Sequence, residues 1–204
     1  MNKKLLIDIL NCHIKSFCDA EKYAKLTGQR TPNDTANWSQ ILASALTGTI
    51  GLERKKGADL SDGSDVKGAN VWSAIDTPRF NGVVPAGRVL TDYTNSSKIY
   101  PKIFFILWDY LSLTEKKNER CRIWCVRPKD DTKFLDVVDN WYKRKRKSNN
   151  FQLHPPRNKE NNIFTNECGN LSYPLVFNAI ADNKSYSIKY IDIDKINNGL
   201  CETV

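Results

Sequence analysis

The sequence predicts an α/β domain of the α+β kind, with a mixed central sheet and flanking helices. Two helix-like segments open the chain, short strand-like runs follow, and a third helix precedes further strands. The 204 residues suit one hydrophobic core, and 40% apolar with 26% charged residues excludes a disordered or collagen-like chain. We therefore expect a single domain over 1–204, divided into helices in 1–50, a hairpin and sheet in 51–127, and a basic helix, loop and strands in 128–204.

Two amphipathic helices are expected in the first 50 residues. Apolar residues recur at spacings of three and four from residue 5 to 26, and Gly28 ends the pattern. His13 lies on this apolar stripe, where a buried structural histidine is favoured over a ligand. Thr35 or Asn37 is expected to cap a second helix that continues to Leu46.

Strand signals dominate the rest of the chain. Asp62-Gly63 is a tight-turn signal between two strand-compatible pieces, and 103–108 and 121–126 resemble buried strands. The polar stretch 76–98 is expected to be a long loop, and such loops are often functional. A helix is expected over 130–147, then a loop with two prolines and strands near 175–177 and 186–191.

Export, membrane insertion and a cysteine-based metal site are not expected. Asp8 and Lys15 interrupt the signal-like start, and no apolar run is long enough to cross a bilayer. The spacings of the six cysteines match no zinc ribbon or finger, so reduced thiols are favoured. These observations predict a cytoplasmic protein without a membrane partner.

The charge pattern favours a polyanionic partner. The chain has 31 Lys and Arg against 23 Asp and Glu, a net charge of +8. Seven cations and no acid lie between residues 143 and 159, namely Lys143, Arg144, Lys145, Arg146, Lys147, Arg157 and Lys159. This run is typical of a phosphate-binding surface, although cations also suit the solvated last turn of a helix. Both interpretations can hold together.

Asp65-Val66-Lys67 is the strongest candidate for chemistry. On a strand, alternation places Asp65 and Lys67 on one face. Asp59 lies six residues before Asp65, and Glu53 six residues before Asp59. A three-residue loop over 62–64 would place Asp59 opposite Lys67, whereas a two-residue loop would point it away. A shared site on a hairpin therefore requires the three-residue loop.

Such a site suits a hard cation. Asp59, Asp65 and Val66 are the expected ligands of Mg²⁺, and Lys67 is placed to orient water and to neutralise charge on a phosphate. A surface hairpin with merely solvated Asp and Lys side chains is the alternative, because Asp-x-Lys is common by chance.

The segment Gly57-Ala58-Asp59-Leu60, a short turn and then Asp65-Val66-Lys67 resembles the PD-(D/E)xK signature of type II restriction endonucleases. Asp59 matches the first acid, while Asp65 and Lys67 match the second acid and the lysine. Glu53 resembles the auxiliary catalytic acid that some members carry. The chain departs from the pattern at Ala58, which replaces proline, and at Asp65, where Glu is commoner.

The resemblance implies a single nuclease domain with a restriction-endonuclease-like core and Mg²⁺-dependent hydrolysis of double-stranded DNA that leaves 5′-phosphates. Palindromic cleavage would imply a homodimer. Base contacts are expected first from Asn70, Arg79 and Asn81, and second from Gln152 and Arg157, because Arg suits guanine and an amide suits adenine. Each of these side chains could instead stabilise a turn.

Two other functions remain open from the residues alone. One is a repair or structure-selective nicking nuclease with the same core. The other is a basic nucleic-acid-binding protein without catalysis, which would bind DNA but cleave none with any divalent metal.

Overall fold

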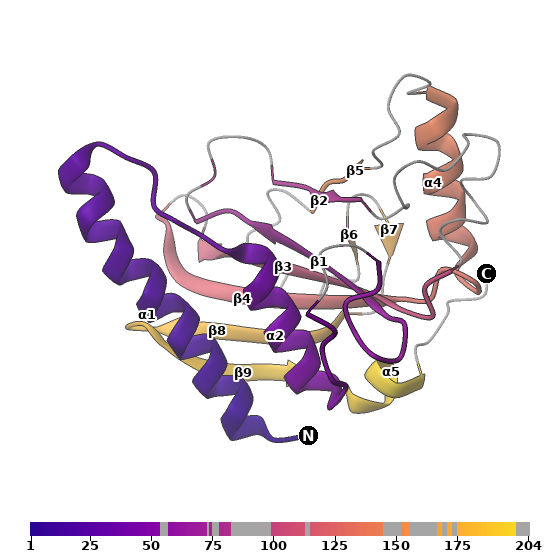
Figure 1. Ribbon diagram of the computed structural model, residues 1–204, viewed down its shortest axis with the longest axis horizontal. Helices are drawn as coiled ribbons and strands as arrows, with labels where there is room; N and C mark the ends of the chain where they lie inside the picture. The colour runs from indigo at the N-terminus through magenta and orange to yellow at the C-terminus, as the bar shows by residue number, and fades with distance from the viewer. Residues whose placement is uncertain are drawn as a thin grey trace.

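The computed structural model describes residues 1–53, 57–72, 74, 78–82, 99–112, 115–144, 152–155, 167–168, 171–172 and 175–198. A five-stranded mixed sheet lies at its centre (Figure 1), with the strand order β1-β3-β4-β8-β9. These strands are β1 (Asp65–Asn70), β3 (Ile103–Ser112), β4 (Lys117–Val126), β8 (Leu175–Asp182) and β9 (Ser185–Ile191). β1 pairs with β3 in parallel, and the other neighbours are antiparallel. The predicted fold class is confirmed.

Two long helices, α1 (Lys3–Thr27) and α2 (Thr35–Thr47), cover one face of the sheet (Figure 1). Their apolar residues join Val66, Phe104 and Trp108 in one hydrophobic core. The predicted cap of α2 is wrong by one position or more: Asp34 caps it, and its carboxylate accepts a hydrogen bond from the Asn37 N–H at 3.3 Å. A short acceptor immediately before the first helical residue reaches the unpaired N–H groups.

Smaller elements pack on the opposite face. These are the two-stranded ribbon of β2 (Phe80–Asn81) and β5 (Gln152–Leu153), the pair β6 (Glu167–Cys168) and β7 (Leu171–Ser172), and α4 (Thr132–Arg144). Phe80, Leu153 and Phe134 bury their side chains in a second core there, against Phe105 of β3. Strands of two residues are too short to show a period, so the sequence did not predict them.

The helix expected over 130–147 is described as α4, up to Arg144. Asp131 caps its start, because its Oδ1 accepts the Phe134 N–H at 2.9 Å. Lys145, Arg146, Lys147 and Arg157 lie outside the described residues. A short helix, α5 (Ile193–Asn198), follows β9 and was not predicted.

The expected hairpin is wrong. β1 takes β3 as its parallel neighbour, with Lys67 in register with Phe105. The segment around Asp59 pairs instead with 50–52, through Gly51 and Leu60. Asp62-Gly63 does form a turn, in which Gly63 adopts a φ of 88°. The buried strand β3 offers a full set of partners along β1, and local sequence could not reveal that long-range pairing.

His13 is a buried structural residue, as expected. It is 2% exposed and lies among Trp38, Trp72 and Trp108, with ring centroids 4.9, 5.0 and 4.3 Å away. Burial lowers the pKa of His13 to about 4, so its ring is neutral at physiological pH. Cys12, Cys18 and Cys121 carry free thiols. Among the described helices, each is too short or too polar to span a bilayer.

Candidate active site

Asp65 and Lys67 lie on the face of β1 that carries the second core. Their register partners are Ile103 and Phe105, both buried in that core. The Lys67 Nζ lies 2.7 Å from the Asp65 Oδ2. The Asp65 side chain is completely buried and the Lys67 side chain is 18% exposed. The alternation of the strand therefore joins the acid and the amine as the sequence predicted.

Asp59 reaches the same place from the open edge of the sheet. The Asp65 N–H donates to the Lys102 carbonyl and the Val71 N–H donates to the Trp108 carbonyl, so odd-numbered residues of this segment direct their backbone groups toward β3. Because these directions alternate along a strand, the N–H and carbonyl of Val66 face away from β3. The Val66 N–H donates to the Asp59 Oδ2 at 2.8 Å. The side chain of Asp59 thus makes the connection to β1 that strand pairing was expected to make.

Gln40 holds the other oxygen of Asp59. Its Nε2 donates to the Asp59 Oδ1 at 2.8 Å, from α2. The helix lies close enough because β1 has glycine at position 68, where a Cβ would lie 2.5 Å from the Ser39 Oγ. Gln40 was not predicted. Its neighbours on the same helix face include the polar residues Asn37, Ser44 and Thr47, so the local pattern does not distinguish it.

Burial is the main influence on the pKa of Asp65 in its pair with Lys67. Burial raises the pKa of Asp65 to about 7, Lys67 opposes this shift, and the neighbouring Asp59 adds to it. Tyr100 lies in the same environment: burial and the charges of Asp65 and Asp59 raise its pKa to about 12. The phenol therefore stays protonated at neutral pH.

The donor set fits a hard divalent cation. Apart from the ion pair with Lys67, both buried oxygens of Asp65 lack a hydrogen-bond partner among the described residues. A second carboxylate, Asp59, lies beside them, and the Val66 carbonyl faces the same edge. The described residues contain no cluster of three or more Asp, Glu, His or Cys side chains able to hold a metal. Mg²⁺ suits such a sparse set, since it retains waters and takes phosphate oxygens.

Glu53 is not gathered with the two aspartates. It is exposed, with a left-handed backbone φ of 46°, and lines a groove of about 1220 Å³ that also reaches Asp59. The groove runs between the start of α1, α2 and residues 48–53. An auxiliary role for Glu53 stays a prediction.

A family model described as MamI restriction endonuclease matches residues 22–186. This chain belongs to that family. A MamI-family relative, "Type II restriction enzyme MamI" of Microbacterium ammoniaphilum, is 33% identical over an alignment of 172 residues; the match covers 78% of this chain and 56% of the relative. The chain thus spans little more than half the length of that relative. No solved structure matches this MamI-family chain.

The candidate base-contacting residues of this MamI-family chain have different surroundings. Asn70 stabilises the turn after β1, since its Oδ1 accepts the Trp72 N–H at 2.7 Å. Asn81 and Gln152 face each other in the β2–β5 ribbon, although 71 positions separate them in the sequence. Arg79 is half-buried beside Phe80. Arg157 falls outside the described residues.

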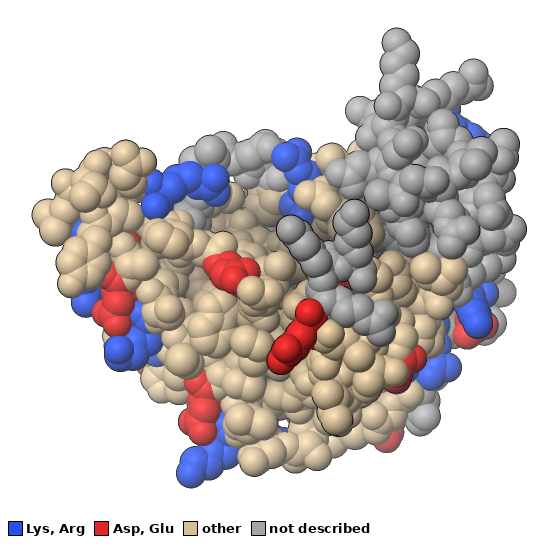
Figure 2. Space-filling model, in the orientation of Figure 1, with Lys and Arg blue, Asp and Glu red and all other residues tan. Residues whose placement is uncertain are grey.

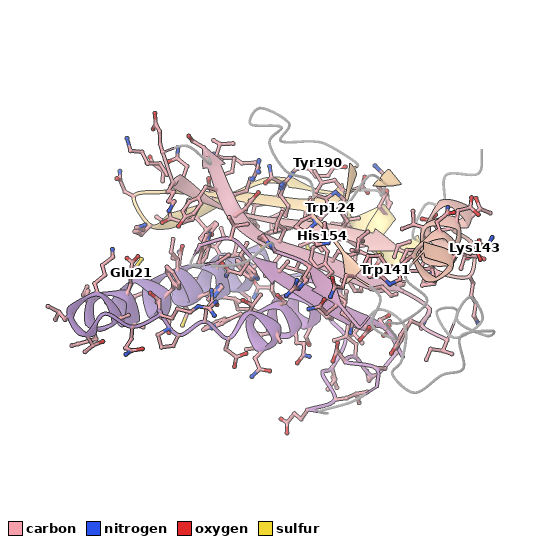
Figure 3. The ribbon with its side chains drawn as sticks, turned by 90° about the horizontal axis from the view of Figure 1, so that it is seen from above. Glu21, Trp124, Trp141, Lys143, His154 and Tyr190 are labelled. Carbon is pink, nitrogen blue, oxygen red and sulfur yellow. The ribbon has the colours of Figure 1, made fainter. Side chains whose placement is uncertain are left out.

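The described part of the basic run lies on α4. Lys143 forms an ion pair with Asp139 on the same helix, as expected for a solvated helix end. Figure 3 shows Lys143 at the opposite end of the molecule from Glu21 of α1. On the face over α1 and α2, positive and negative side chains are interspersed (Figure 2). A phosphate contact by Lys143 to Lys147 stays a prediction.

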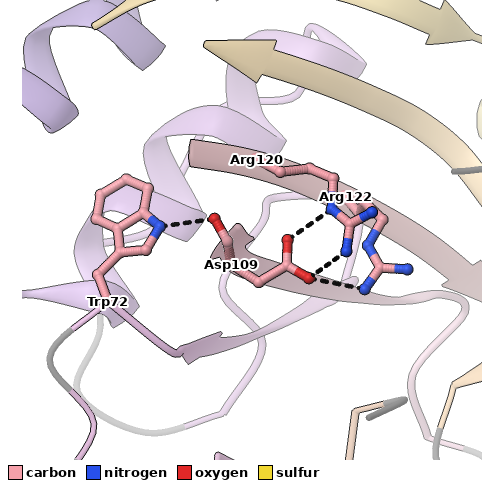
Figure 4. Close-up of polar contacts among 4 residues, drawn as sticks. All are labelled: Trp72, Asp109, Arg120 and Arg122. Carbon is pink, nitrogen blue, oxygen red and sulfur yellow. Dashed lines mark hydrogen bonds and ion pairs between the residues drawn. The ribbon is translucent and has the colours of Figure 1, made fainter. Parts of the chain in front are cut away.

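A second polar cluster lies on the sheet, on β3 and β4. The Asp109 carboxylate accepts from Arg120 at 2.8 and 2.6 Å and from Arg122 at 2.8 Å, and its carbonyl accepts from the Trp72 Nε1 at 2.8 Å (Figure 4). Arg122 also lies over the Trp124 ring, 4.9 Å from its centroid. All three charged residues are about 3% exposed, so this cluster has a structural role.

Proposed function

We propose that this chain is a type II restriction endonuclease that hydrolyses double-stranded DNA in the presence of Mg²⁺. One observation carries the proposal: buried Asp65, paired with Lys67 and adjacent to Asp59, in a chain of the MamI restriction endonuclease family. Water attacks the phosphorus, the bond to the 3′ oxygen breaks, and the products are a 5′-phosphate and a 3′-hydroxyl. The proposed setting is the cytoplasm.

Asp59, Asp65 and the Val66 carbonyl would hold the Mg²⁺. Bound there, the cation supplies Lewis acidity and neutralises charge on the phosphate. Lys67 donates toward the attacking water and the phosphate oxygens, since its amine is partly exposed while its partner is buried. Gln40 and the Val66 N–H hold the Asp59 carboxylate in a fixed orientation.

Cleavage on both strands at a palindromic sequence requires two active sites. We therefore include a homodimer in the proposal. Asn70, Arg79, Asn81, Gln152 and Arg157 are the proposed contacts to bases, and the cations from Lys143 to Lys147 are the proposed contacts to phosphates.

The direct test is incubation of the purified protein with unmethylated bacteriophage DNA and Mg²⁺. Discrete fragments with 5′-phosphate ends are expected. Lys67→Ala should abolish them while duplex binding, measured by gel shift, stays near that of the parent protein. Lys189→Ala is the matched control, because Lys189 is exposed on β9 at the opposite edge of the same sheet.

Other outcomes would replace the proposal. Nicks confined to one strand would favour a repair or structure-selective nickase. Binding without cleavage in Mg²⁺, Mn²⁺ or Ca²⁺ would identify a non-catalytic nucleic-acid-binding protein. Normal cleavage by Lys67→Ala would refute the assigned site.

A further inference from the structure

The β2–β5 ribbon presents two amide side chains as neighbours. Asn81 is in register with Gln152, and Phe80 is in register with Leu153. Phe80 is 0% exposed and Leu153 2%, whereas Asn81 is exposed and Gln152 half-exposed. Since side chains alternate along a strand, the amides project from the side of the ribbon opposite the core. Directly opposed residues have Cβ atoms about 4.5–5.5 Å apart.

The ribbon is fixed to the catalytic face of the sheet. The ring of Phe80 packs on Phe105, with centroids 5.1 Å apart. Phe105 is the register partner of Lys67, so the ribbon rests on the strand position next to the proposed catalytic amine. At the other end, the His154 Nδ1 lies 3.3 Å from the Pro78 carbonyl oxygen, linking the two ribbon strands; Figure 3 labels His154.

An amide carries the hydrogen-bond pattern that adenine requires. Its NH₂ donates to adenine N7 while its C=O accepts from the N6 amine, and a two-stranded ribbon fits into the major groove of B-DNA. Asn70 is engaged with the Trp72 N–H, so it is a poorer candidate. Asn81 and Gln152, in contrast, are accessible to solvent, and the ribbon that carries them is held by the packing of Phe80 on Phe105.

We infer that Asn81 and Gln152 act together as one reader, which recognises adenines of neighbouring A·T base pairs through the major groove. This inference rests on the proposed nuclease function, and it specifies the part of the DNA sequence that the ribbon reads. Both amides come from segments far apart in the chain, so the reading element exists only in the folded protein.

The test begins with the site that the parent protein cleaves, mapped on bacteriophage DNA. Each adenine of that site is then replaced in turn by 7-deazaadenine, which removes N7 but keeps base pairing. At two neighbouring positions the substitution should weaken cleavage of cognate DNA by about 5- to 150-fold. Asn81→Ala should lose sensitivity at one of these positions and Gln152→Ala at the other.

Matched variants separate base reading from folding. Asn81→Asp keeps the size and one acceptor but loses the donor to N7, and should behave as Asn81→Ala does. Gln29→Ala changes an exposed amide after α1 and should retain the parent pattern. Thermal unfolding midpoints should stay within a few degrees for all variants.

The outcomes distinguish the two proposals. No cleavage of any DNA by the parent protein refutes the nuclease and the reader together. Site-specific cleavage at a sequence without neighbouring A·T pairs refutes only the reader. Equal 7-deazaadenine sensitivity in parent and variants also refutes it, and would mean that the two amides merely stabilise the ribbon.

Discussion

At the scale of single residues, Asp65 has a stability cost that follows from its position. Its pKa is about 7 in the folded chain, mainly because of burial, against an ordinary value of 3.8. Because the folded chain binds this proton more tightly than the unfolded chain, protonation of Asp65 stabilises the fold at low pH. This stabilisation is lost as the pH rises through about 7. Above pH 7 the metal-free protein therefore contains a buried carboxylate that destabilises it.

Asp65→Asn should make the metal-free protein more stable at pH 8, because the amide has no charge to bury. The expected gain in unfolding free energy is about 4 kcal/mol, from the difference between the folded pKa of about 7 and the ordinary value of 3.8. At pH 5 the gain should be smaller, since the folded wild-type carboxyl is protonated there. Urea unfolding in EDTA at the two pH values measures it.

Asp62→Asn is the control for this measurement. Asp62 is exposed, three positions before Asp65, and its Oδ1 accepts the Ser64 N–H at 2.9 Å, a bond that an asparagine oxygen can keep. An equal gain at both pH values, or an equal gain in both variants, would contradict the burial argument. The Asp65→Asn variant should also cleave no DNA.

Gln40 acts through Asp59, so we expect it to be a positioning residue. Gln40→Ala removes the 2.8 Å hydrogen bond to the Asp59 Oδ1, so that the carboxylate keeps the Val66 N–H at its other oxygen but loses the second contact that fixes its orientation. Partners of metal-binding side chains typically contribute about 10- to 100-fold in metal affinity or activity. The Mg²⁺ concentration for half-maximal cleavage should rise accordingly, while cleavage at saturating Mg²⁺ recovers.

A second measurement for Gln40 does not depend on cleavage. The rise in unfolding midpoint on adding Mg²⁺ should need correspondingly more metal. Asn37→Ala is the matched control on the same helix, since the Asn37 amide contacts Asp34 at 2.6 Å instead of Asp59. If both variants show the parent metal dependence, Gln40 does not position Asp59.

At the scale of elements, the β3–β4 pair is stabilised by a buried charge cluster. Asp109→Ala would leave Arg120 and Arg122 buried without their shared carboxylate. Breaking a buried ion pair by removing one partner costs about 3–5 kcal/mol. The free energy of unfolding in urea should fall by that amount. Glu115→Ala, which removes an exposed partner of Lys117 near the same hairpin, should change it little.

Most helices and long strands could be predicted because each has a local signal. α1 is an example: its apolar stripe of Leu6, Leu10 and Ile14 is repeated over several turns and ends at Gly28. The pairing of β1 could not be predicted in the same way. Its partner β3 begins 33 residues after β1 ends, and loop chemistry at Asp62-Gly63 suggested a nearer neighbour.

At the scale of the whole molecule, affinity for DNA should depend on the basic run that begins in α4. Replacing Lys143, Arg144, Lys145, Arg146 and Lys147 by Gln should weaken binding similarly on cognate and random duplexes, because phosphate contacts carry no sequence information. Removing one phosphate contact should make the log–log salt slope shallower by about 0.9. Fluorescence anisotropy at several salt concentrations measures both the affinity and the slope.

Lys15→Gln with Lys22→Gln is the control for the salt experiment. These lysines pair with Asp19 on α1, at the opposite end of the molecule, and should not change the slope. An unchanged slope in the α4 variant as well would assign its cations to a solvated helix end, as the Lys143–Asp139 pair already indicates for one of them.

The sequence by itself determined the mixed α/β class, the three longer helices α1, α2 and α4, the basic character, and the shared face of Asp65 and Lys67. These properties depend on periodicity and composition within one segment. Only the tertiary structure decided how Asp59 joins the site, that Gln40 supports it, and that Asn81 faces Gln152. Each of these contacts joins segments whose approach depends on packing against β3, and a local pattern of residues contains no information about which distant strand lies beside it.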